Sequence, residues 1–369
     1  YHRHRLRSLL ATMRQALLLT VACMLRTKVR SFSFGQQPRL SAFLKHPNAA
    51  ATTSTRSPSP STSTSTARAT RRQSSSFHMT SLKPPRMSAS DEADGLYLFD
   101  FDGVVCDSCD ECTVSAFRTC QKLGVLDDVS DAVDIDSDGT TLPDWLFQKM
   151  REIRPAIETG WQIPVLLYVF LEQQQQQQHK EPTMSPAQIV ANYETLIEET
   201  LTKWGKSDED MIQTFGDVRD SWIREDLGSW LDINAFYDGI PAALSSCKGR
   251  SALITTKQQR FAIALCRHAG IDEETLPDGN IYGLGQYKSK ADVIVDQMQA
   301  GSFRADETHF FEDRWPTLEK CLKDDRLEGV KLHLCNWGYC TEDEVEKAQS
   351  EPRVAVLDLR GFVGLVQKD

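Results

Sequence analysis

The stretch LYLFDFDGVVCDS, residues 96–108, places two aspartates directly after a run of apolar residues. Residues 96–99 have no polar position among them, which is typical of a strand buried on both faces of a parallel sheet. Asp100 and Asp102 would then lie at the carboxyl end of this strand, where open α/β sheets bind ligands. We therefore expect a reaction centre here, although an Asx-type turn after a strand also explains DFDG when taken alone.

Positive charge dominates the first quarter of the 369-residue chain. Fifteen of the 42 lysines and arginines, but none of the 52 aspartates and glutamates, lie in residues 1–90. An apolar run at 16–25 and a Ser/Thr/Pro-rich tract at 57–66 complete a composition that does not pack as a domain. The apolar run is too short to span a bilayer, which takes about 20 residues. We expect a disordered targeting presequence over residues 1–90 and no membrane anchor.

This presequence resembles the two-part plastid presequences of algae with complex plastids, in which a short apolar segment precedes a basic, hydroxyl-rich one. The resemblance implies a plastid or chloroplast location, with a mitochondrial or cytoplasmic location as the alternatives. A basic arm that binds nucleic acid is the competing interpretation. Because residues 1–90 have few aromatic side chains to stack on bases, we expect no nucleic-acid partner.

The ten cysteines have irregular spacing, which does not indicate a disulfide scaffold in a chain of this length. Three of them form CDSCDEC at residues 106–112, and thiolates separated by two residues are potential zinc ligands. No second pair with ligand spacing follows. We therefore interpret Cys106, Cys109 and Cys112 as structural thiols and not as metal ligands.

Residues 109–245 differ in pattern from the stretch before them, because Trp, Leu and Ile recur at helical spacing and no alternating run appears. This pattern predicts an inserted α-helical domain. The apolar stretch at 165–171 has the composition of a buried strand, but it continues into Glu and Gln, which favour helix. The six glutamines at 173–178 are a low-complexity insertion, which we place in an exposed helix end or loop without a catalytic part.

The loop RPAIETGW, residues 154–161, lies inside this insertion. Arg154 and Glu158 would offer a cation and a hydrogen-bonding acid to a substrate. They are also four residues apart, so they equally fit a surface pair worth about 0.2–0.5 kcal/mol. Pro155 already requires a break in the helix, which favours a structural explanation on the local pattern alone.

A second apolar stretch, SALITT at 251–256, predicts a strand that ends in two hydroxyl residues. Thr255 and Thr256 would lie at its carboxyl end, where a hydroxyl can donate to an anionic oxygen. A threonine in this position is equally often an ordinary cap. We expect Lys257 to begin the following helix, which Gly270 ends.

The segment YKSKADVIVDQM contains Ser289 and Asp292 at the spacing of a helix capping box. Lys290 then falls in the first helical turn, where a cation opposes the helix dipole by roughly 0.3–1 kcal/mol unless an anion lies nearby. We infer that Lys290 is directed at a phosphate or at the aspartates. Lys288 takes this role if the helix begins earlier.

A third strand is predicted at 308–311, and it ends in Glu312 and Asp313. Further strands are expected at 332–335 and 354–359. Repeated strand–helix units predict an α/β fold with a Rossmann-like, doubly wound parallel sheet. Its sheet domain would comprise residues 91–108 and 246–369, with the helical cap of residues 109–245 inserted between them.

The order of these motifs resembles that of the haloacid dehalogenase-like hydrolases: DxDGxxxD after a strand, a strand ending in Thr, a Lys, and a strand ending in paired acids. The residues that match, in order, are Asp100, Asp102, Gly103 and Asp107; Thr255; Lys290; and Glu312 with Asp313. The segments FYDGIPAAL at 236–244 and NWGY at 336–339 are similar to the phosphoglycolate phosphatase-like branch. They are more similar still to plant and algal members with a large helical cap.

The resemblance implies a Mg²⁺-dependent phosphatase that acts on a small phosphorylated metabolite through an aspartyl-phosphate. It implies these roles: Asp100 as nucleophile, Asp102 as general acid and base, Thr255, Thr256 and Lys290 as phosphate ligands, and Asp100, the Asp102 carbonyl, Asp313 and Glu312 around Mg²⁺. It also raises Arg154 and Glu158 as substrate contacts. The alternatives are a phosphomutase of the same family and a non-catalytic binding or assembly protein that retains the fold.

Overall fold

The structure, a computed structural model, describes residues 95–127, 129, 142–178 and 183–368. All of them belong to the second of the two units into which the chain divides, Lys83–Asp369. The expected presequence, residues 1–90, lies outside the described residues, so its targeting role stays a prediction. Among the described helices, none is both long enough and apolar enough to cross a bilayer.

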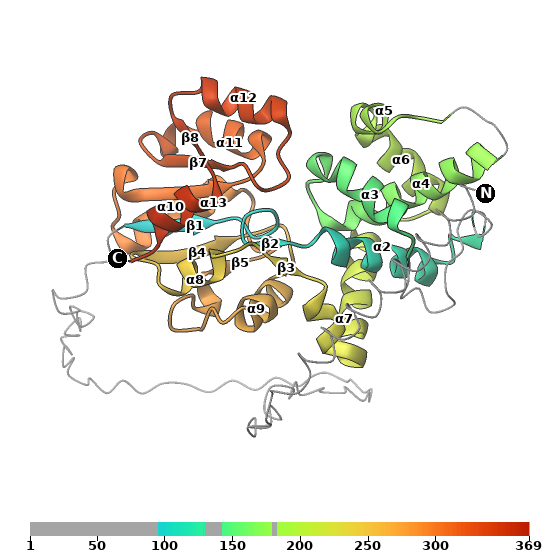
Figure 1. Ribbon diagram of the computed structural model, residues 1–369, viewed down its shortest axis with the longest axis horizontal. Helices are drawn as coiled ribbons and strands as arrows, with labels where there is room; N and C mark the ends of the chain where they lie inside the picture. Colours follow the sequence, from blue (N-terminus) through green and yellow to red (C-terminus); the bar gives the residue numbers. More distant parts are fainter. Residues whose placement is uncertain (1–94, 128, 130–141, 179–182, 369) are drawn as a thin grey trace, which may run out of the picture. The chain divides into compact units, whose positions relative to one another are not determined.

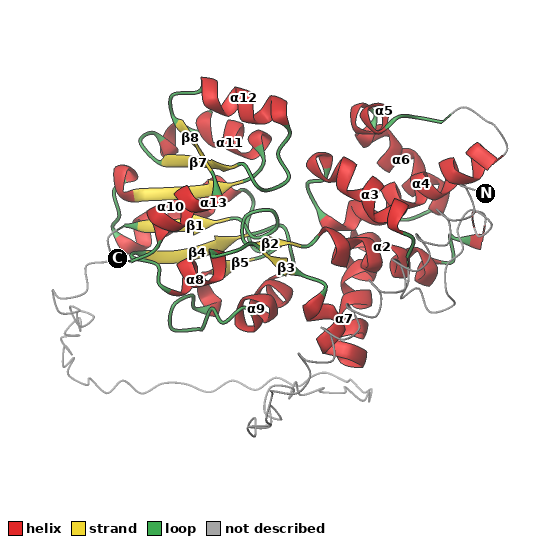
Figure 2. Cartoon of the chain, in the orientation of Figure 1, coloured by secondary structure: helices red, strands yellow, loops and turns green. Residues whose placement is uncertain are grey.

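A six-stranded, wholly parallel sheet forms the centre of the described unit (Figure 2). Its strands, in spatial order, are β5 (Ile281–Tyr282), β4 (Arg250–Ile254), β1 (Leu96–Phe99), β6 (Thr308–Glu312), β7 (Lys331–Cys335) and β8 (Val354–Leu357). The chain runs outward from β1 to β5 and then returns to place β6 on the other side of β1. The neighbours β1 and β6 therefore form the topological switch point of the sheet.

Helices cover both faces of this sheet, because successive side chains of β1 point to opposite sides. Leu96 and Leu98 belong to the core shared with α10 (Lys290–Gly301), α11 (Trp315–Leu322) and α12 (Glu342–Ser350). Tyr97 and Phe99 belong to the core on the other face, shared with α8 (Ile240–Ser245), α9 (Gln259–His268) and α13 (Leu359–Val366). The predicted doubly wound α/β fold is confirmed.

The insertion consists of helices in its described parts (Figure 1). They are α2 (Cys109–Leu123), α3 (Asp144–Ile153), α4 (Ile163–Gln178), α5 (Pro186–Ala191), α6 (Tyr193–Trp204) and α7 (Asp208–Asp232). A short antiparallel ribbon of β2 (Cys106–Asp107) and β3 (Ala235–Phe236), which the sequence did not predict, joins both ends of the insertion to the sheet. Helix α8, within the expected cap range 109–245, packs against α13 beside the sheet.

The apolar stretch at 165–171 is helical, as its polar continuation predicted, and forms the buried part of α4. The glutamine run extends the same helix. Gln173 is only 7% exposed, so the expectation of an exposed run was wrong for this residue. It lies four residues after the buried Val169 and therefore on the same face of the helix.

Candidate active site

Three carboxylates meet at the switch point of the sheet. Asp100 follows β1, Glu312 ends β6 and Asp313 comes next, so neighbouring parallel strands deliver them to one edge. Each offers an oxygen within 4.8 Å of the others. Among the described residues, they are the one group of three or more His, Cys, Asp or Glu side chains arranged closely enough to hold a metal ion.

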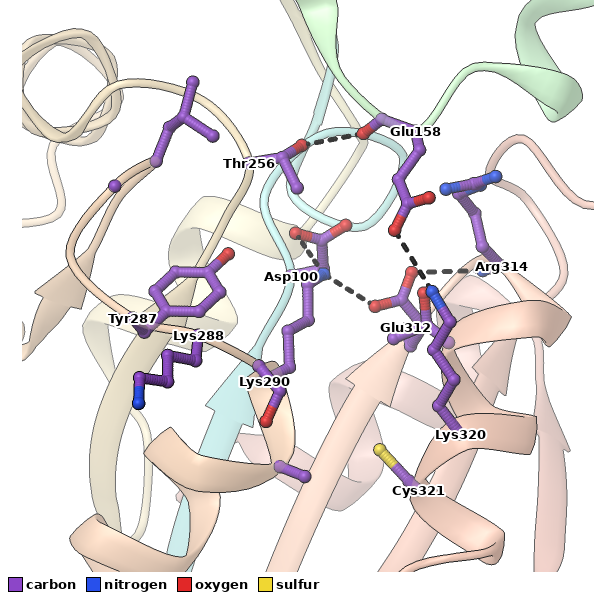
Figure 3. A pocket seen from close by; sticks show the side chains of 15 residues that line it. Asp100, Glu158, Thr256, Tyr287, Lys288, Lys290, Glu312, Arg314, Lys320 and Cys321 are labelled. Atoms are coloured by element: carbon purple, nitrogen blue, oxygen red, sulfur yellow. Dashed lines mark hydrogen bonds and ion pairs between the residues drawn. The ribbon is translucent and has the colours of Figure 1, made fainter. Parts of the chain in front are cut away.

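Lys290 enters this cluster from the first turn of α10. Its Nζ lies 2.9 Å from Asp100 Oδ1 and 2.7 Å from Glu312 Oε2 (Figure 3). Burial alone lowers the pKa of Lys290, but the two carboxylates hold it above its usual range. The Ser289 hydroxyl accepts a hydrogen bond from the Asp292 amide at 3.1 Å, so the helix begins where predicted. Lys288 is exposed and lies on the wall of the same cavity.

The buried acids carry more negative charge than one lysine balances. Burial raises the pKa of Asp100 to about 7; Lys290 opposes this shift and Glu312 adds to it. Burial, Glu312 and Asp100 likewise raise the pKa of Asp313. Asp313 Oδ1 is buried without a hydrogen-bond partner among the described residues. The cluster therefore has both the charge and a free oxygen for a cation.

Glu312 differs from Asp313 in that both of its oxygens are engaged. Oε2 accepts from Lys290 Nζ, and Oε1 accepts from the Arg314 amide at 3.2 Å. Asp313 Oδ2 accepts from the Tyr339 amide at 2.6 Å, which leaves Oδ1 free. The geometry therefore favours Asp313 over Glu312 as a direct ligand of a cation.

The loop after β7, which contains the NWGY segment, holds the turn after β1 against Asp313. Gly103 has a φ of +89°, and a Cβ at this position would lie 1.9 Å from Asp313 Oδ2. The Tyr339 hydroxyl donates to Asp107 Oδ1 at 2.9 Å and accepts from the Ser108 amide at 3.0 Å. The NWGY segment thus contacts both the DxDG turn and the metal-ligand candidate, although its sequence alone did not indicate a position.

Asp102 is contacted on one oxygen by two side chains. Its Oδ1 accepts a short hydrogen bond from the Ser108 hydroxyl and lies 3.2 Å from Lys257 Nζ. Lys257 was not predicted as a site residue, and its predicted place at the start of a helix is wrong. Helix α9 begins at Gln259, because the Lys257 amide donates to Thr255 Oγ1 at 3.0 Å and holds the loop in a turn.

The two predicted phosphate-binding threonines are at the expected edge of the sheet. Thr255 is buried, and its hydroxyl oxygen accepts a hydrogen bond from the Lys257 amide. Thr256 donates from Oγ1 to the backbone carbonyl of Glu158 at 3.0 Å, so it ties the cap loop to the sheet domain. Thr256 also lines a cavity of about 270 Å³ together with Asp100 and Lys290 (Figure 3).

The surface-pair explanation for Arg154 and Glu158 is wrong. Arg154 is only 8% exposed, stacks its guanidinium 4.0 Å from the Tyr339 ring centre, and donates to the Ile157 carbonyl at 3.2 Å. Glu158 Oε1 instead lies 3.3 Å from Lys320 Nζ. Pro155 places Arg154 in a 3-10 turn, so the two side chains do not share a helix face. Glu158 lines the cavity that contains Asp100.

The three cysteines of CDSCDEC lie in the protein interior. Cys106, Cys109 and Cys112 are all buried and free of disulfides. Burial raises the pKa of each thiol, that of Cys109 to about 12, so these residues stay protonated at neutral pH. Zinc itself deprotonates the thiols that bind it, so the interpretation of these three residues as structural thiols stays a prediction.

No family model and no curated protein matches the chain. Its structure is similar to solved structures that include a predicted phosphatase from Clostridium acetobutylicum, with 16% identity, 73% of this chain and 97% of that chain covered, and a TM-score of 0.45. A predicted phosphoglycolate phosphatase from Haemophilus somnus has 13% identity, coverages of 73% and 96%, and a TM-score of 0.44.

A hydrolase of the haloacid dehalogenase-like family from Streptococcus pneumoniae has 15% identity to the chain. The match covers 71% of this chain and 93% of that chain, with a TM-score of 0.41. These names include the family that the sequence motifs resemble. At such identities the likeness is one of fold, and because the TM-scores lie below 0.5, the function proposed next rests on the site itself.

Proposed function

We propose that the chain is a Mg²⁺-dependent phosphatase that hydrolyses a small phosphorylated metabolite through an aspartyl-phosphate on Asp100. One observation carries the proposal: Lys290 contacts Asp100 and Glu312, while the adjacent Asp313 keeps a buried oxygen that has no partner among the residues that the structure describes. A nucleophilic carboxylate, a phosphate-binding cation and a metal ligand are the groups that phosphoryl transfer requires at one point.

The acidic cluster fits Mg²⁺, a hard cation that takes carboxylate and carbonyl oxygens and keeps several waters. Asp100, Asp313 and the backbone carbonyl of Asp102 would hold the ion. Glu312, whose oxygens are already engaged, would contribute its charge and keep Lys290 in place. When bound, Mg²⁺ supplies positive charge that offsets the negative charge on the phosphoryl oxygens.

In the first step the Asp100 carboxylate attacks phosphorus. A bond forms between a carboxylate oxygen and phosphorus while the bond from phosphorus to the leaving oxygen breaks. Asp102 gives its proton to that oxygen, so the product leaves as a neutral alcohol. Lys290 and the strand-end hydroxyl of Thr255 or Thr256 stabilise the charge on the transferring oxygens.

In the second step water attacks the phosphorus of the aspartyl-phosphate. Asp102, now ionised, takes the proton of that water, and the bond between Asp100 and phosphorus breaks. Inorganic phosphate leaves, and both acids return to their starting states. The cap loop contacts the sheet domain through Glu158, at Thr256 and Lys320, and closure of the cap over bound substrate would limit the access of bulk water.

Phosphate release from a panel of glycolate, sugar and aryl phosphates tests this function. We expect the wild-type chain to release phosphate from at least one of these esters when Mg²⁺ is present and from none after chelation. Asp100→Asn should release none. Formation of an isomer without phosphate release would indicate a phosphomutase instead, and a folded protein that converts no ester would contradict the proposal.

A further inference from the structure

A buried ionic network of Glu111, Arg219 and Lys257 contacts Asp102. Arg219 of α7 donates two hydrogen bonds to Glu111 of α2, from Nε to Oε1 at 2.7 Å and from Nη2 to Oε2 at 2.6 Å. Lys257 Nζ lies 3.7 Å from Glu111 Oε2 and 3.2 Å from Asp102 Oδ1. The network therefore runs from two cap helices to the side chain proposed as acid and base.

The members of this network are fixed in position and in charge. Glu111 is fully buried, Arg219 is 3% exposed and Lys257 is 4% exposed. Burial alone raises the pKa of Glu111, but Arg219 and Lys257 lower it to about 2. Glu111 Oε1 also accepts from Ser115 Oγ at 2.6 Å and Trp230 Nε1 at 3.3 Å. A buried carboxylate is costly unless it is paired and hydrogen-bonded, and both oxygens of Glu111 accept hydrogen bonds here.

Both side-chain partners of Asp102 contact the same oxygen. Ser108 Oγ donates to Oδ1, and Lys257 Nζ approaches Oδ1 from the network. Among the described residues, none donates a hydrogen bond to Oδ2. A carboxylate that is held through one oxygen presents its other oxygen in a defined direction, and a proton-transfer group needs this geometry to within hydrogen-bond reach.

We propose that Lys257 is a positioning residue for Asp102, held in place by Glu111 and Arg219. It fixes the carboxyl group through Oδ1, so that Oδ2 gives the proton to the leaving oxygen and later takes one from water. When Asp102 has given up its proton, the ammonium already lies beside the new carboxylate and stabilises it without rearrangement. This inference rests on the proposed phosphatase function and adds to it a residue outside the family motifs.

The leaving group decides how much Lys257 matters. A p-nitrophenolate departs without a proton, whereas an unsubstituted phenolate, derived from a much weaker acid, needs one. We would compare kcat/KM of wild type and Lys257→Met for p-nitrophenyl, p-chlorophenyl and phenyl phosphate in the presence of Mg²⁺. This ratio reports the steps up to departure of the phenol. We expect Lys257→Met to lose about tenfold or more on phenyl phosphate, within the range for acid catalysis, and little on p-nitrophenyl phosphate.

Lys257→Met should fold, because Glu111 keeps both bonds to Arg219 and Asp102 keeps Ser108. Its circular dichroism spectrum and Tm verify this, and Lys257→Arg, which keeps the charge, should recover part of the loss on phenyl phosphate. Arg260→Met is the matched control. It removes the ion pair between Arg260 of α9 and Asp220 of α7, 2.7 Å apart, without touching Asp102, so kcat/KM should change by the same factor for all three esters.

The outcomes separate the two proposals. A Lys257→Met loss that is the same for every ester, or no loss at all, would overturn the positioning role while leaving the phosphatase in place. If Lys257→Arg loses as much kcat/KM on phenyl phosphate, relative to p-nitrophenyl phosphate, as Lys257→Met does, the role of the charge is overturned. If the wild-type protein hydrolyses none of the esters and releases phosphate from no metabolite, the phosphatase function itself fails and the positioning role fails with it.

Discussion

Lys290 Nζ lies 2.9 Å from Asp100 Oδ1, so the side chain of one strand end is paired with a lysine that the sequence places almost 200 residues later. Lys290→Met should lower kcat by about a hundredfold or more, because it removes the cation that faces the transferring oxygens. It should also lower the free energy of unfolding by roughly 3 kcal/mol, since Asp100 and Glu312 lose their buried partner.

Lys288→Met is the control for that variant, because this lysine is exposed and lies two residues before Lys290, ahead of α10. Its kcat and its free energy of unfolding should stay close to those of wild type. Steady-state kinetics and urea unfolding measure both quantities. Equal effects of the two substitutions would mean that the pairing of Lys290 with Asp100 has no special part in the reaction.

Asp100→Asn should inactivate the protein and yet stabilise it when Mg²⁺ is absent. The pKa of Asp100 is about 7 in the folded state against 3.8 for the ordinary carboxyl group. Between these values the folded state binds the extra proton, so stability falls as pH rises from about 4 through 7. At pH 8 the variant should be more stable than wild type by on the order of 2 kcal/mol, and at pH 4 by little.

Thermal unfolding of both proteins at pH 4 to 8, with a chelator, measures this difference. Mg²⁺ should reduce it at pH 8, because the cation stabilises the wild-type carboxylates and not the amide. A variant that is less stable than wild type at pH 8 without Mg²⁺ would show that Asp100 is not strained by its burial.

Gly103→Ala should disturb the site through Asp313. The new methyl group would lie 1.9 Å from Asp313 Oδ2, and the backbone φ of +89° is itself unfavourable for alanine. We expect kcat to fall at least tenfold and the rise of Tm on adding Mg²⁺ to shrink, because the ligand carboxylate must move. Gly124→Ala is the control: its φ of +67° is also positive, but its surroundings are open.

Gly124→Ala should cost about 1 kcal/mol of stability and leave kcat and the Mg²⁺ response unchanged. Circular dichroism, Tm and phosphate release distinguish the two variants. If both glycines tolerate alanine equally in activity, the close approach of the DxDG turn to Asp313 is not required.

Asp313→Asn should remove most of the thermal stabilisation by Mg²⁺, whereas Glu312→Gln should retain part of it. The reason is that, within the described part of the chain, Asp313 Oδ1 has no hydrogen-bond partner, while Glu312 accepts from Lys290 and from the Arg314 amide. The shift of Tm between chelator and millimolar Mg²⁺ is the readout, and it needs no substrate. A full shift in Asp313→Asn would contradict the ligand assignment.

His309 and His333 form a buried pair on β6 and β7, with Nδ1 and Nε2 3.0 Å apart. Burial and nearby Lys331 lower the pKa of His309 to about 4, and burial, His309 and Lys331 lower that of His333 to about 3. Below pH 6.5 the unfolded chain protonates these histidines and the folded chain does not. Their contribution therefore destabilises the fold increasingly as pH falls from 6.5 toward 4.

Between pH 7 and pH 5 this contribution should amount to on the order of 2 kcal/mol for the pair. Asp100 has the opposite slope in the same range, so the readout is the difference between wild type and a His309→Gln, His333→Gln double variant. Urea unfolding at several pH values should show a smaller loss toward acid pH in the double variant. Parallel pH profiles would contradict the pKa assignments.

The strand ends were predictable because each depends on a short local pattern. An apolar run followed by Asp100, or by Glu312, marks a buried strand and its edge, and parallel strands bring those edges together. The start of α10 at Lys290 followed from the Ser289 cap in the same way. The candidate metal ligands and the candidate phosphate-binding lysine could therefore be predicted from the sequence.

Local patterns could not predict the buried network of Lys257, Glu111 and Arg219. Their contacts join residues 108 positions apart in the case of Glu111 and Arg219, and no local pattern specifies which helices of a cap will meet. Lys257 did carry a signal, since it follows two hydroxyl residues at a strand end. Its assignment to a helix hid that signal. The β2–β3 ribbon could not be predicted either, because strands of two residues have no periodicity.

The most direct test of the account uses Asp102→Asn with p-nitrophenyl phosphate and Mg²⁺. This ester needs no proton to lose its leaving group, so Asp100 should still take the phosphoryl group, while water lacks its base and the intermediate accumulates. We predict a burst of one p-nitrophenol per active site and, by mass spectrometry after acid quench, a phosphoryl group on Asp100. Turnover without a burst, or a phosphoryl group on any other residue, would contradict the assignment of Asp100 as the nucleophile.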